Sequence, residues 1–340
     1  MNRYSRQSAL AQIGDEGQKK IDSSRVAIVG LGALGSVSAQ LCARAGIGFL
    51  KLIDRDIVEL SNLQRQVLFT ESDAREGRAK STASKDHLQT INSEIKIEAV
   101  LEDLRGENIA ELLGDVDAVL DGTDNFETRY LINDFAVKNK IPYIYGGAIE
   151  TRSMVYSVLP DGRHCLRCLF PQAPTADSAQ TCDRSGILAS ASHWTAALQF
   201  TQLVRYLTQG AASIEPVLIQ QDVWSGEVKR IQAAEFAAER CEGCRNGIFA
   251  ALHSQSGTQT LKLCGRNAVQ IQPEPGQGII SWNSLSERWK DRGQVLVGTD
   301  FARATFEQYE LTLFKNGRVI IKGTEDPALA RSLYARWVGC

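Results

Sequence analysis

The stretch "VAIVGLGALGSVSAQLCARAGIGFLKLIDRD", from Val26 to Asp56, decides the fold. It reads as an apolar strand, a glycine turn, a helix, a second strand and a closing acid. Gly30, Gly32 and Gly35 have the G-x-G-x-x-G spacing, in which the first glycine permits a tight turn, the second lets a phosphate approach the backbone, and the third lets the helix pack on the strand. The stretch therefore predicts a βαβ unit that binds a nucleotide at the N-terminus of its helix, without indicating which nucleotide.

The alternation of strands and helices continues to about residue 160. Further strands are expected at 95–101, 116–123, 141–149 and 153–159, and helices at 79–90, 127–140 and 190–209. The pattern predicts an α/β fold with a doubly wound, Rossmann-like and mostly parallel sheet, on which ligands bind at the carboxyl ends of the strands. The long helix at 190–209 is expected to give the core Trp194, Leu198, Thr201, Val204 and Leu207.

The sequence changes character after Gly247. The segment "YELTLFKNGRVIIKG" predicts a hairpin that turns at Asn316-Gly317, and a helix is expected to follow with its cap at Thr324 or Asp326. We therefore divide the chain into a large domain at 1–250 and a small α+β domain at 258–340. No chemical motif indicates the role of the small domain.

Composition excludes several classes of protein. The 340 residues carry 38 basic and 40 acidic side chains and a formal net charge of −2, whereas nucleic-acid-binding proteins usually have a basic excess. No apolar run reaches the roughly 18 residues that a membrane-spanning helix needs. The N-terminal "MNRYSRQSAL" lacks the apolar stretch of a secretory signal, so a cytoplasmic location is expected.

Four of the eight cysteines form two C-x-x-C pairs, Cys165 and Cys168 in "CLRC" and Cys241 and Cys244 in "CEGC". Four thiolates suit tetrahedral zinc, and a site with four protein ligands has no open position for a substrate. The gap between the pairs is too long for a zinc ribbon, so the fold must bring them together. The sequence predicts a structural zinc site, with two unrelated pairs or one redox pair as the alternatives.

The residues after the second strand discriminate between nucleotides. In "DRDIVELSNLQRQVLF", Asp54 could bind ribose hydroxyls in either a dehydrogenase or an ATP-dependent enzyme. A dehydrogenase has no general need for the polar residues that follow, which are Ser61, Asn62, Arg65 and Gln66. A triphosphate site does need them, because an arginine offers a planar fork of donors to phosphate oxygens.

Two later motifs fit the same interpretation. Lys80, in "GRAKS", begins the next helix and would add a mobile positive charge. Asp124, in "DGTDN", follows the fourth strand, where one carboxylate could hold magnesium together with water and phosphate oxygens. Each basic residue alone could be a solvated surface group, but every member of the set falls at a strand end or in the following loop.

These motifs, in this order, resemble those of the MoeB/ThiF adenylyltransferases, the bacterial relatives of ubiquitin-activating enzymes. The resemblance rests on "GLGALG", "DRD", "SNLQRQ", "GRAKS", "DGTDNFETRYLIND" and the two C-x-x-C pairs, and covers residues 1–247. The later "LCGRNAVQI" resembles longer ThiF-type proteins. The resemblance implies that residues 1–250 form an ATP-binding adenylyltransferase domain with a zinc site made by the four paired cysteines, and that the protein is a homodimer.

The implied reaction is the ATP- and Mg²⁺-dependent adenylation of the C-terminal glycine of a ubiquitin-like sulfur carrier. The carrier would be a ThiS-like or MoaD-like protein that ends in Gly-Gly and serves thiamine or molybdopterin biosynthesis, and the sequence does not choose between them. A cysteine desulfurase or a rhodanese would be the sulfur donor. An NAD-dependent oxidoreductase with a structural zinc is the main alternative, and a non-catalytic scaffold that keeps the fold is a third possibility.

The resemblance also assigns site residues. Those implied to bind the nucleotide are Gly30, Gly32, Ala33, Gly35, Asp54, Asp56, Ser61, Asn62, Leu63, Gln64, Arg65, Gln66, Lys80, Asp124 and Asn125. The implied catalytic residues are Arg6, which would reach the ATP of the neighbouring subunit, Arg65, Lys80, Asp124 as the magnesium ligand, and Cys182. Many members have glycine where this chain has Ala33, and an alanine is tolerated there if its φ is negative.

Two features of the set affect its chemistry. The attacking carboxylate is already ionised at pH 7, so no protein base is required, and the four histidines are expected to serve surface or packing. The role of Cys182 has two alternatives: it could join covalently to the carrier, or it could be a loop thiol that is dispensable for adenylation.

Overall fold

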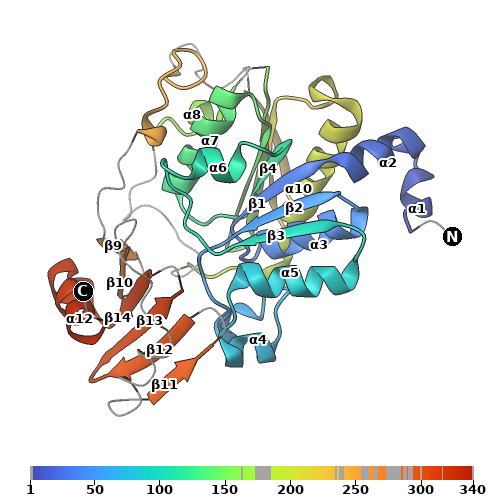
Figure 1. The fold of residues 1–340 in the computed structure, drawn as a ribbon. Coiled ribbons are helices and arrows are strands. Elements are labelled where there is room, and N and C mark those ends of the chain that lie inside the picture. The colour runs from blue at the N-terminus through green and yellow to red at the C-terminus, as the bar shows by residue number, and fades with distance from the viewer. Residues whose placement is uncertain are drawn as a thin grey trace. The chain divides into compact units, whose positions relative to one another are not determined.

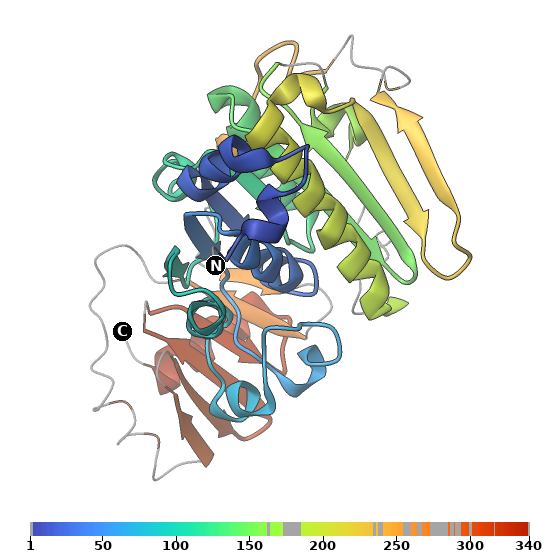
Figure 2. The ribbon, with the colours of Figure 1, turned by 90° about the vertical axis from the view of Figure 1, so that its right-hand side faces the viewer.

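The computed structural model describes residues 3–161, 164–172, 185–233, 236, 241–253, 260–263, 267–272, 285, 289, 294–298, 301–315 and 317–338. The chain divides into two units, Met1–Arg75 with Ala79–Ser254, and Glu76–Arg78 with Gln255–Cys340. Figures 1 and 2 show the ribbon in two views. No helix among the described residues has the length and apolar character needed to cross a bilayer.

The large unit is built on one eight-stranded sheet with the order β3-β2-β1-β4-β5-β6-β7-β8. The parallel strands are β1 (Arg25–Val29), β2 (Phe49–Ile53), β3 (Lys96–Val100), β4 (Ala118–Asp121) and β5 (Tyr143–Ile149). The antiparallel strands are β6 (Arg152–Val158), β7 (Val217–Asp222) and β8 (Val228–Gln232). The predicted Rossmann-like α/β fold is thus confirmed, with an antiparallel extension at one side.

Helices cover both faces of this sheet (Figure 1). The longer ones are α2 (Gly14–Ser23), α3 (Gly35–Ala45), α5 (Lys80–Ile91), α7 (Phe126–Asn139) and α10 (Ala189–Gln209). The shorter ones are α1 (Ser5–Ser8), α4 (Glu71–Glu76), α6 (Ile109–Leu113) and α8 (Leu166–Leu169). Because successive side chains of a strand point to opposite faces, Val26 and Ile28 of β1 join one core cluster, and Ala27 and Val29 join the other.

The prediction for the inner face of α10 was wrong in part. Leu198, Val204 and Leu207 pack on the core only half-buried, and Thr201 is exposed. The fully buried face instead carries Ser192, Thr195, Ala196, Gln199 and Leu203. The physical reason is that α10 crosses strand ends whose carbonyl groups need donors, and Gln199 supplies two such hydrogen bonds.

The small unit contains a six-stranded antiparallel sheet with the order β11-β12-β13-β14-β10-β9. Its elements are β9 (Thr260–Leu263), β10 (Ala268–Ile271), β11 (Gln294–Val297), β12 (Phe301–Phe306), β13 (Tyr309–Phe314), β14 (Val319–Lys322) and α12 (Pro327–Trp337). The predicted hairpin is β13–β14, and Asp326 caps α12 by accepting from the amide of Ala328 at 2.8 Å. The unit has its own core, which includes Trp289, Phe306 and Leu311. Asn316, Cys264 and Cys340 lie outside the described residues.

Candidate functional site

The glycine turn, Gly30–Gly35, connects β1 to α3. Gly30 has a φ of +84°, and an added Cβ would lie 2.6 Å from the carbonyl oxygen of Gly122. A Cβ on Gly35 would lie 1.8 Å from the carbonyl oxygen of Gly30. Around Gly32, by contrast, the nearest atom to a Cβ is Nε2 of Gln66 at 3.8 Å. Backbone packing therefore requires the first and third glycines, while the second leaves space that a ligand could fill.

Ala33 and Asp54 complete the turn. Ala33 is not among the described non-glycine residues with a positive φ, so alanine is tolerated at this position. The buried carboxylate of Asp54, after β2, accepts hydrogen bonds from the amide of Leu31 at 2.6 Å and from the amide of Asp56 at 2.7 Å. Burial raises the pKa of Asp54, although the ammonium group of Lys80 opposes this. Asp54 thus ties the end of β2 to the glycine turn.

Lys80 lies against the same strand end. Its amide donates to the carbonyl oxygen of Asp56 at 2.9 Å, and its Nζ lies 3.5 Å from Oδ2 of Asp56. The side chain is only 7% exposed and lies beside Asp56, and the mobility of its charge stays a prediction. Arg55, which sequence reasoning missed, pairs with Asp103 at 2.7 Å. Burial opposes the charge of Arg55, but Asp103 and Asp56 raise its pKa.

The residues from Ser61 to Gln66 begin within a short 3₁₀ turn, Leu60–Asn62, and continue beyond its end. Asn62 is buried and caps this turn reciprocally with Glu59, its Oδ1 accepting from the Glu59 amide at 3.1 Å. Arg65 is half-buried and donates to the carbonyl oxygen of Ser61 at 2.9 Å. The carboxamide of Gln66 is buried, and its Oε1 has no hydrogen-bond partner among the described residues. Ser61 and Gln64 are exposed, and Leu63 packs on the core.

Asp124 and Asn125 belong to the acidic turn, Gly122–Asn125, between β4 and α7. The Asp124 carboxylate is exposed, and within the described residues its one hydrogen bond is to Nδ2 of Asn125 at 3.4 Å. Asn125 caps α7 by accepting from the amide of Thr128 at 2.8 Å. A single available carboxylate beside a nucleotide site fits Mg²⁺, which takes one or two carboxylates and phosphate oxygens.

Hydrogen bonds bring most of these residues to one edge of the sheet. The amide of Gly122 donates to the carbonyl oxygen of Val29 at 2.8 Å, which places the acidic turn beside the glycine turn. Asp54 joins the glycine turn to the segment that pairs with Lys80. Arg6, exposed in α1, makes no hydrogen bond or ion pair with any residue that the structure describes. Cys182 lies outside the described residues.

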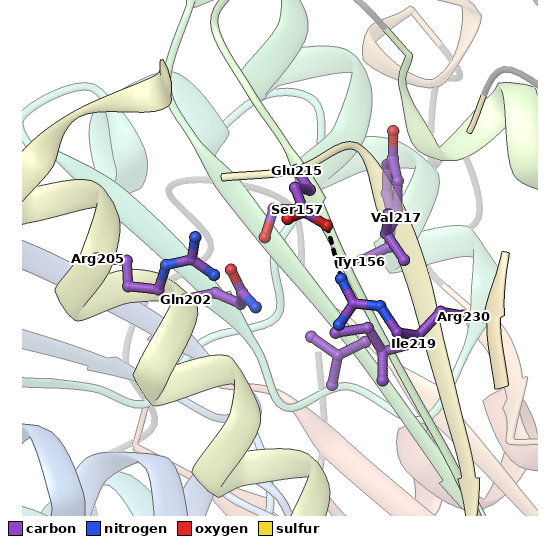
Figure 3. Close-up of a pocket in the computed structure, with 9 residues that line it drawn as sticks. Tyr156, Ser157, Gln202, Arg205, Glu215, Val217, Ile219 and Arg230 are labelled. Carbon is purple, nitrogen blue, oxygen red and sulfur yellow. Dashed lines mark hydrogen bonds and ion pairs between the residues drawn. The ribbon is translucent and has the colours of Figure 1, made fainter. Parts of the chain in front are cut away.

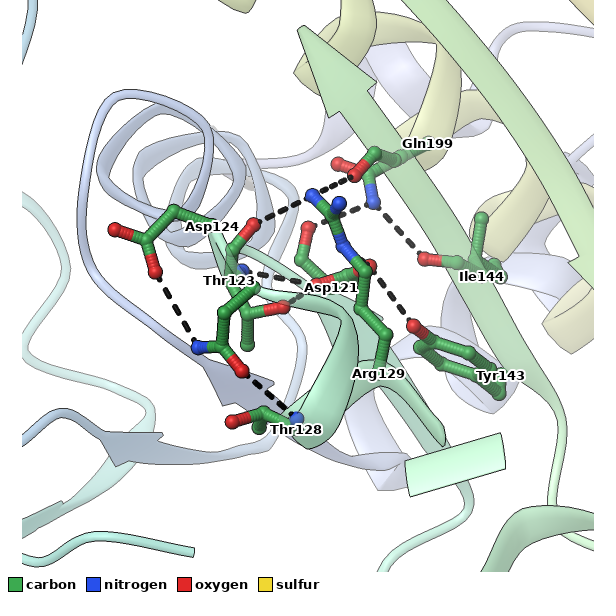
Figure 4. A network of polar contacts seen from close by, with 10 residues as sticks. Asp121, Thr123, Asp124, Thr128, Arg129, Tyr143, Ile144 and Gln199 are labelled. Carbon is green, nitrogen blue, oxygen red and sulfur yellow. Dashed lines mark hydrogen bonds and ion pairs between the residues drawn. The ribbon is translucent and has the colours of Figure 1, made fainter. Parts of the chain in front are cut away.

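Sequence reasoning missed a buried polar network behind the acidic turn, shown in Figure 4. Its members are Asp121, Thr123, Arg129, Tyr143 and Gln199, from three different regions of the chain. The available signals were an acid at the end of an apolar strand and an arginine within the amphipathic helix at 127–140. Neither signal identifies the residues that the acid or the arginine contacts, because hydrogen-bonded partners in this network lie up to 78 positions apart in the sequence.

The two C-x-x-C pairs meet, as the sequence predicts. The Sγ atoms of Cys165, Cys168, Cys241 and Cys244 all lie within 4.8 Å of one another, and this group is named the cysteine cluster below. The Cys165–Cys241 and Cys168–Cys244 sulfur separations are 3.5 and 3.4 Å. A disulfide requires about 2.05 Å, whereas four sulfurs at about 2.3 Å from a tetrahedral zinc lie roughly 3.8 Å apart. The geometry fits a metal and excludes the alternative of two unrelated pairs.

Neighbouring side chains stabilise the cysteine cluster. The amide of Leu166 donates to Oδ1 of Asn133 at 2.8 Å, and Arg167 binds the buried Asp134 with two hydrogen bonds of 2.7 and 2.8 Å. Hydrogen bonding to Cys165 raises the pKa of Cys168, while hydrogen bonds from Cys165 and Cys168 lower the pKa of Cys244 to about 4. A metal ligand must be a thiolate, so binding of zinc here would require the four thiols to lose their protons.

A separate pocket lies between α10 and the antiparallel strands (Figure 3). It includes Gln202, Arg205 and Glu215, and an ion pair of 2.6 Å joins Glu215 to Arg230. None of its lining residues belongs to the predicted site, so the strand ends remain the candidate site.

A Rossmann-like sheet whose glycine turn lies beside Asp54 and the acidic turn is typical of nucleotide-binding α/β proteins. The ThiF family model matches residues 4–245, and the chain belongs to the ThiF family. It is 38% identical over 338 residues to the sulfur carrier protein ThiS adenylyltransferase of Bacillus subtilis, with 99% of both chains covered. It is also 34% identical over 222 residues to the SAMP-activating enzyme E1 of Haloferax volcanii, covering 65% of this chain and 81% of the relative.

A solved structure is similar in fold. MccB of E. coli, in a crystal structure with ATP, has a TM-score of 0.62 and 24% identity, and the match covers 72% of this chain and 74% of MccB. At this identity the likeness concerns the fold alone. The predicted resemblance to the MoeB/ThiF adenylyltransferases is confirmed by the family match and by the full-length relative.

Proposed function

We propose that this chain is a sulfur carrier protein adenylyltransferase, which transfers AMP from ATP to the C-terminal glycine carboxylate of a ubiquitin-like carrier. The observation that carries the proposal is the 38% identity to a ThiS adenylyltransferase, which extends over 99% of both chains and so includes the small unit. That coverage favours a ThiS-like carrier, and hence thiamine biosynthesis, over a MoaD-like carrier. No observation of this molecule favours the NAD-dependent oxidoreductase.

The strand ends suit the electrostatics of this reaction. A carboxylate attacks the α-phosphorus and pyrophosphate leaves, so negative charge approaches negative charge and must be neutralised. We assign the amides of the glycine turn, Lys80 and Arg65 to the phosphates, and the exposed Asp124 to Mg²⁺. The bound Mg²⁺ would neutralise charge on the polyphosphate and its leaving group. Lys80 is suited to its part because its Nζ already lies beside Asp56.

Two further assignments concern partners. Arg6 is exposed on α1 and unpaired within the described residues, which suits an arginine that serves the site of a second copy in a homodimer. We assign Cys182 to sulfur transfer, after adenylation, with a cysteine desulfurase or a rhodanese as sulfur donor. We therefore expect Cys182→Ala to keep full carrier-dependent exchange of pyrophosphate into ATP. A loss of exchange in that variant would place the thiol in the adenylation step itself.

The direct test of the function is exchange of labelled pyrophosphate into ATP with purified carriers. We expect exchange with a ThiS-like carrier that ends in Gly-Gly, and none with the same carrier lacking its last glycine. A MoaD-like carrier is tested in parallel, and the carrier that supports the faster exchange indicates the pathway that the enzyme serves. Failure of every Gly-Gly carrier, in a preparation that is folded and contains zinc, would contradict the proposal.

A further inference from the structure

The carboxylate of Asp121, at the end of β4, is completely buried and uses both of its oxygens. Oδ1 accepts from the amide of Thr123 at 2.9 Å and from its hydroxyl at 2.7 Å. Oδ2 accepts from the hydroxyl of Tyr143 at 2.8 Å and from Nε of Arg129 at 3.3 Å. Asp121 therefore fixes the first half of the acidic turn from the interior of the sheet.

Arg129, on α7, binds the carbonyl side of the same turn. Its Nη2 donates to the carbonyl oxygen of Thr123 at 2.7 Å and to that of Gly146 at 3.3 Å. Its guanidinium also lies 5.2 Å from the ring centroids of both Phe126 and Tyr145. Thr123 is thus held on both sides, since Asp121 binds its amide and hydroxyl while Arg129 binds its carbonyl group (Figure 4). The next residue in the chain is Asp124.

The turn is also held by a distant helix, α10, and by the glycine turn. Nε2 of Gln199 donates to the carbonyl oxygens of Asp121 and Ile144, both at 2.9 Å. A Cβ on Gly122 would lie 2.2 Å from the carbonyl oxygen of Gly30, so the turn packs directly on the glycine turn. The direction in which Asp124 leaves the sheet is consequently set by contacts that Asp124 itself does not make.

Stability alone does not explain why the ion pair of Arg129 and Asp121 is buried. Taking an arginine and an aspartate out of water costs several kcal/mol per ion, and well-packed apolar replacements are often neutral or stabilising. Two charged groups that together bind three backbone groups are better explained by the geometry they impose on the turn. Side chains that orient a metal ligand in this way typically change metal affinity roughly 10- to 100-fold when they are removed.

We propose that Arg129, held by Asp121, whose carboxylate also binds Tyr143, is a positioning residue that sets the acidic turn so that Asp124 can bind the nucleotide-associated Mg²⁺. The inference rests on the proposed function, because Asp124 is the metal ligand only in that reaction. Arg129 is not itself a catalytic residue, since its guanidinium is buried and bonded to the protein.

The test measures carrier-dependent pyrophosphate exchange against Mg²⁺ concentration in Arg129→Lys and Tyr143→Phe. Lysine cannot donate to Asp121, Thr123 and Gly146 together, so we expect the Mg²⁺ concentration for half-maximal exchange to rise about 10-fold in Arg129→Lys. Tyr143→Phe removes one donor to Asp121 and should give a smaller rise. The carrier KM should stay within about twofold of wild type in both variants.

Arg167→Lys is the matched control, because Arg167 pairs with Asp134, a buried aspartate of the same helix, α7, beside the cysteine cluster. It should lower the melting temperature without changing the Mg²⁺ dependence. If both test variants are folded and keep the wild-type Mg²⁺ dependence, Arg129 has no positioning role. If the wild-type protein itself supports no exchange, the proposed function fails first, so the two failures are distinguishable.

Discussion

The cysteine cluster and the nucleotide edge of the sheet are both rich in polar groups but satisfy them differently. In the cluster four sulfurs point at one another within 4.8 Å, and buried partners such as Asn133 and Asp134 hold the surrounding backbone. At the nucleotide edge, several groups are open to a ligand. Oε1 of the buried Gln66 has no hydrogen-bond partner among the described residues, and the Asp124 carboxylate is exposed. Around Gly32, no described atom would lie nearer than 3.8 Å to an added Cβ. The sulfurs of the cluster suit a structural ion that stays bound, and the open groups at the nucleotide edge suit a ligand that binds and leaves.

The comparison predicts that disturbing the first region changes stability, whereas disturbing the second changes activity. Each of the following experiments could contradict this separation of stability from activity.

Removal of zinc should have the largest effect. Structural zinc sites contribute on the order of 10 kcal/mol of apparent binding free energy, part of which is folding free energy, so a strong chelator should lower the melting temperature by tens of degrees. Calorimetry together with a zinc assay measures this, and Cys244→Ser should reproduce it. Cys42→Ala alters a buried thiol outside the cluster and should leave the zinc content unchanged. An unchanged melting temperature after verified metal loss would refute a stabilising ion.

Asp124→Ala should separate activity from stability most clearly. The side chain is exposed and makes one long hydrogen bond among the described residues, so its loss should leave the melting temperature and zinc content as they are. Without the carboxylate that would hold the charge-neutralising Mg²⁺ at the reacting phosphates, carrier-dependent exchange should fall roughly 10²-fold or more. Asp117→Ala, directly before β4, serves as a control for removing one acid. Near-normal exchange by the Asp124 variant would remove this residue from the metal role.

The two alanine variants of the glycine turn form a matched pair. Gly35→Ala forces a Cβ to within 1.8 Å of a backbone oxygen and should destabilise the protein by about 1–3 kcal/mol. Gly32→Ala meets nothing nearer than 3.8 Å, so it should unfold like wild type but bind ATP more weakly. Urea unfolding and isothermal calorimetry with ATP measure the two quantities. Equal stability losses in both variants would show that Gly32 also serves packing.

Asn125→Ala should have the smallest effect of the set. It removes the side chain that caps α7, and losing such a cap typically costs about 1 kcal/mol of stability. Asn125→Asp keeps an acceptor for the amide of Thr128 and should retain most of that stability. A large loss of exchange in Asn125→Asp, without a loss of stability, would instead assign Asn125 to the nucleotide.

Local patterns predicted much of this architecture. Apolar runs indicated the parallel strands, the glycine spacing indicated the turn at Gly30, and the two C-x-x-C pairs were expected to meet. The partners of Asp121 could not be predicted, because Arg129, Tyr143 and Gln199 come from a helix, a neighbouring strand and a distant helix. For the same reason the burial of Lys80 and the polar inner face of α10 were not predicted. Burial is decided by the packing of distant segments, which residue spacing does not encode.

The most direct test of the account is a crystal structure of the protein with a non-hydrolysable ATP analogue and Mg²⁺. We expect the phosphate oxygens to accept hydrogen bonds from the amides of Gly30–Gly35. Lys80 and Arg65 should contact the polyphosphate, and Asp124 should bind the metal. A nucleotide bound elsewhere, or a polyphosphate that these three side chains do not reach, would contradict it.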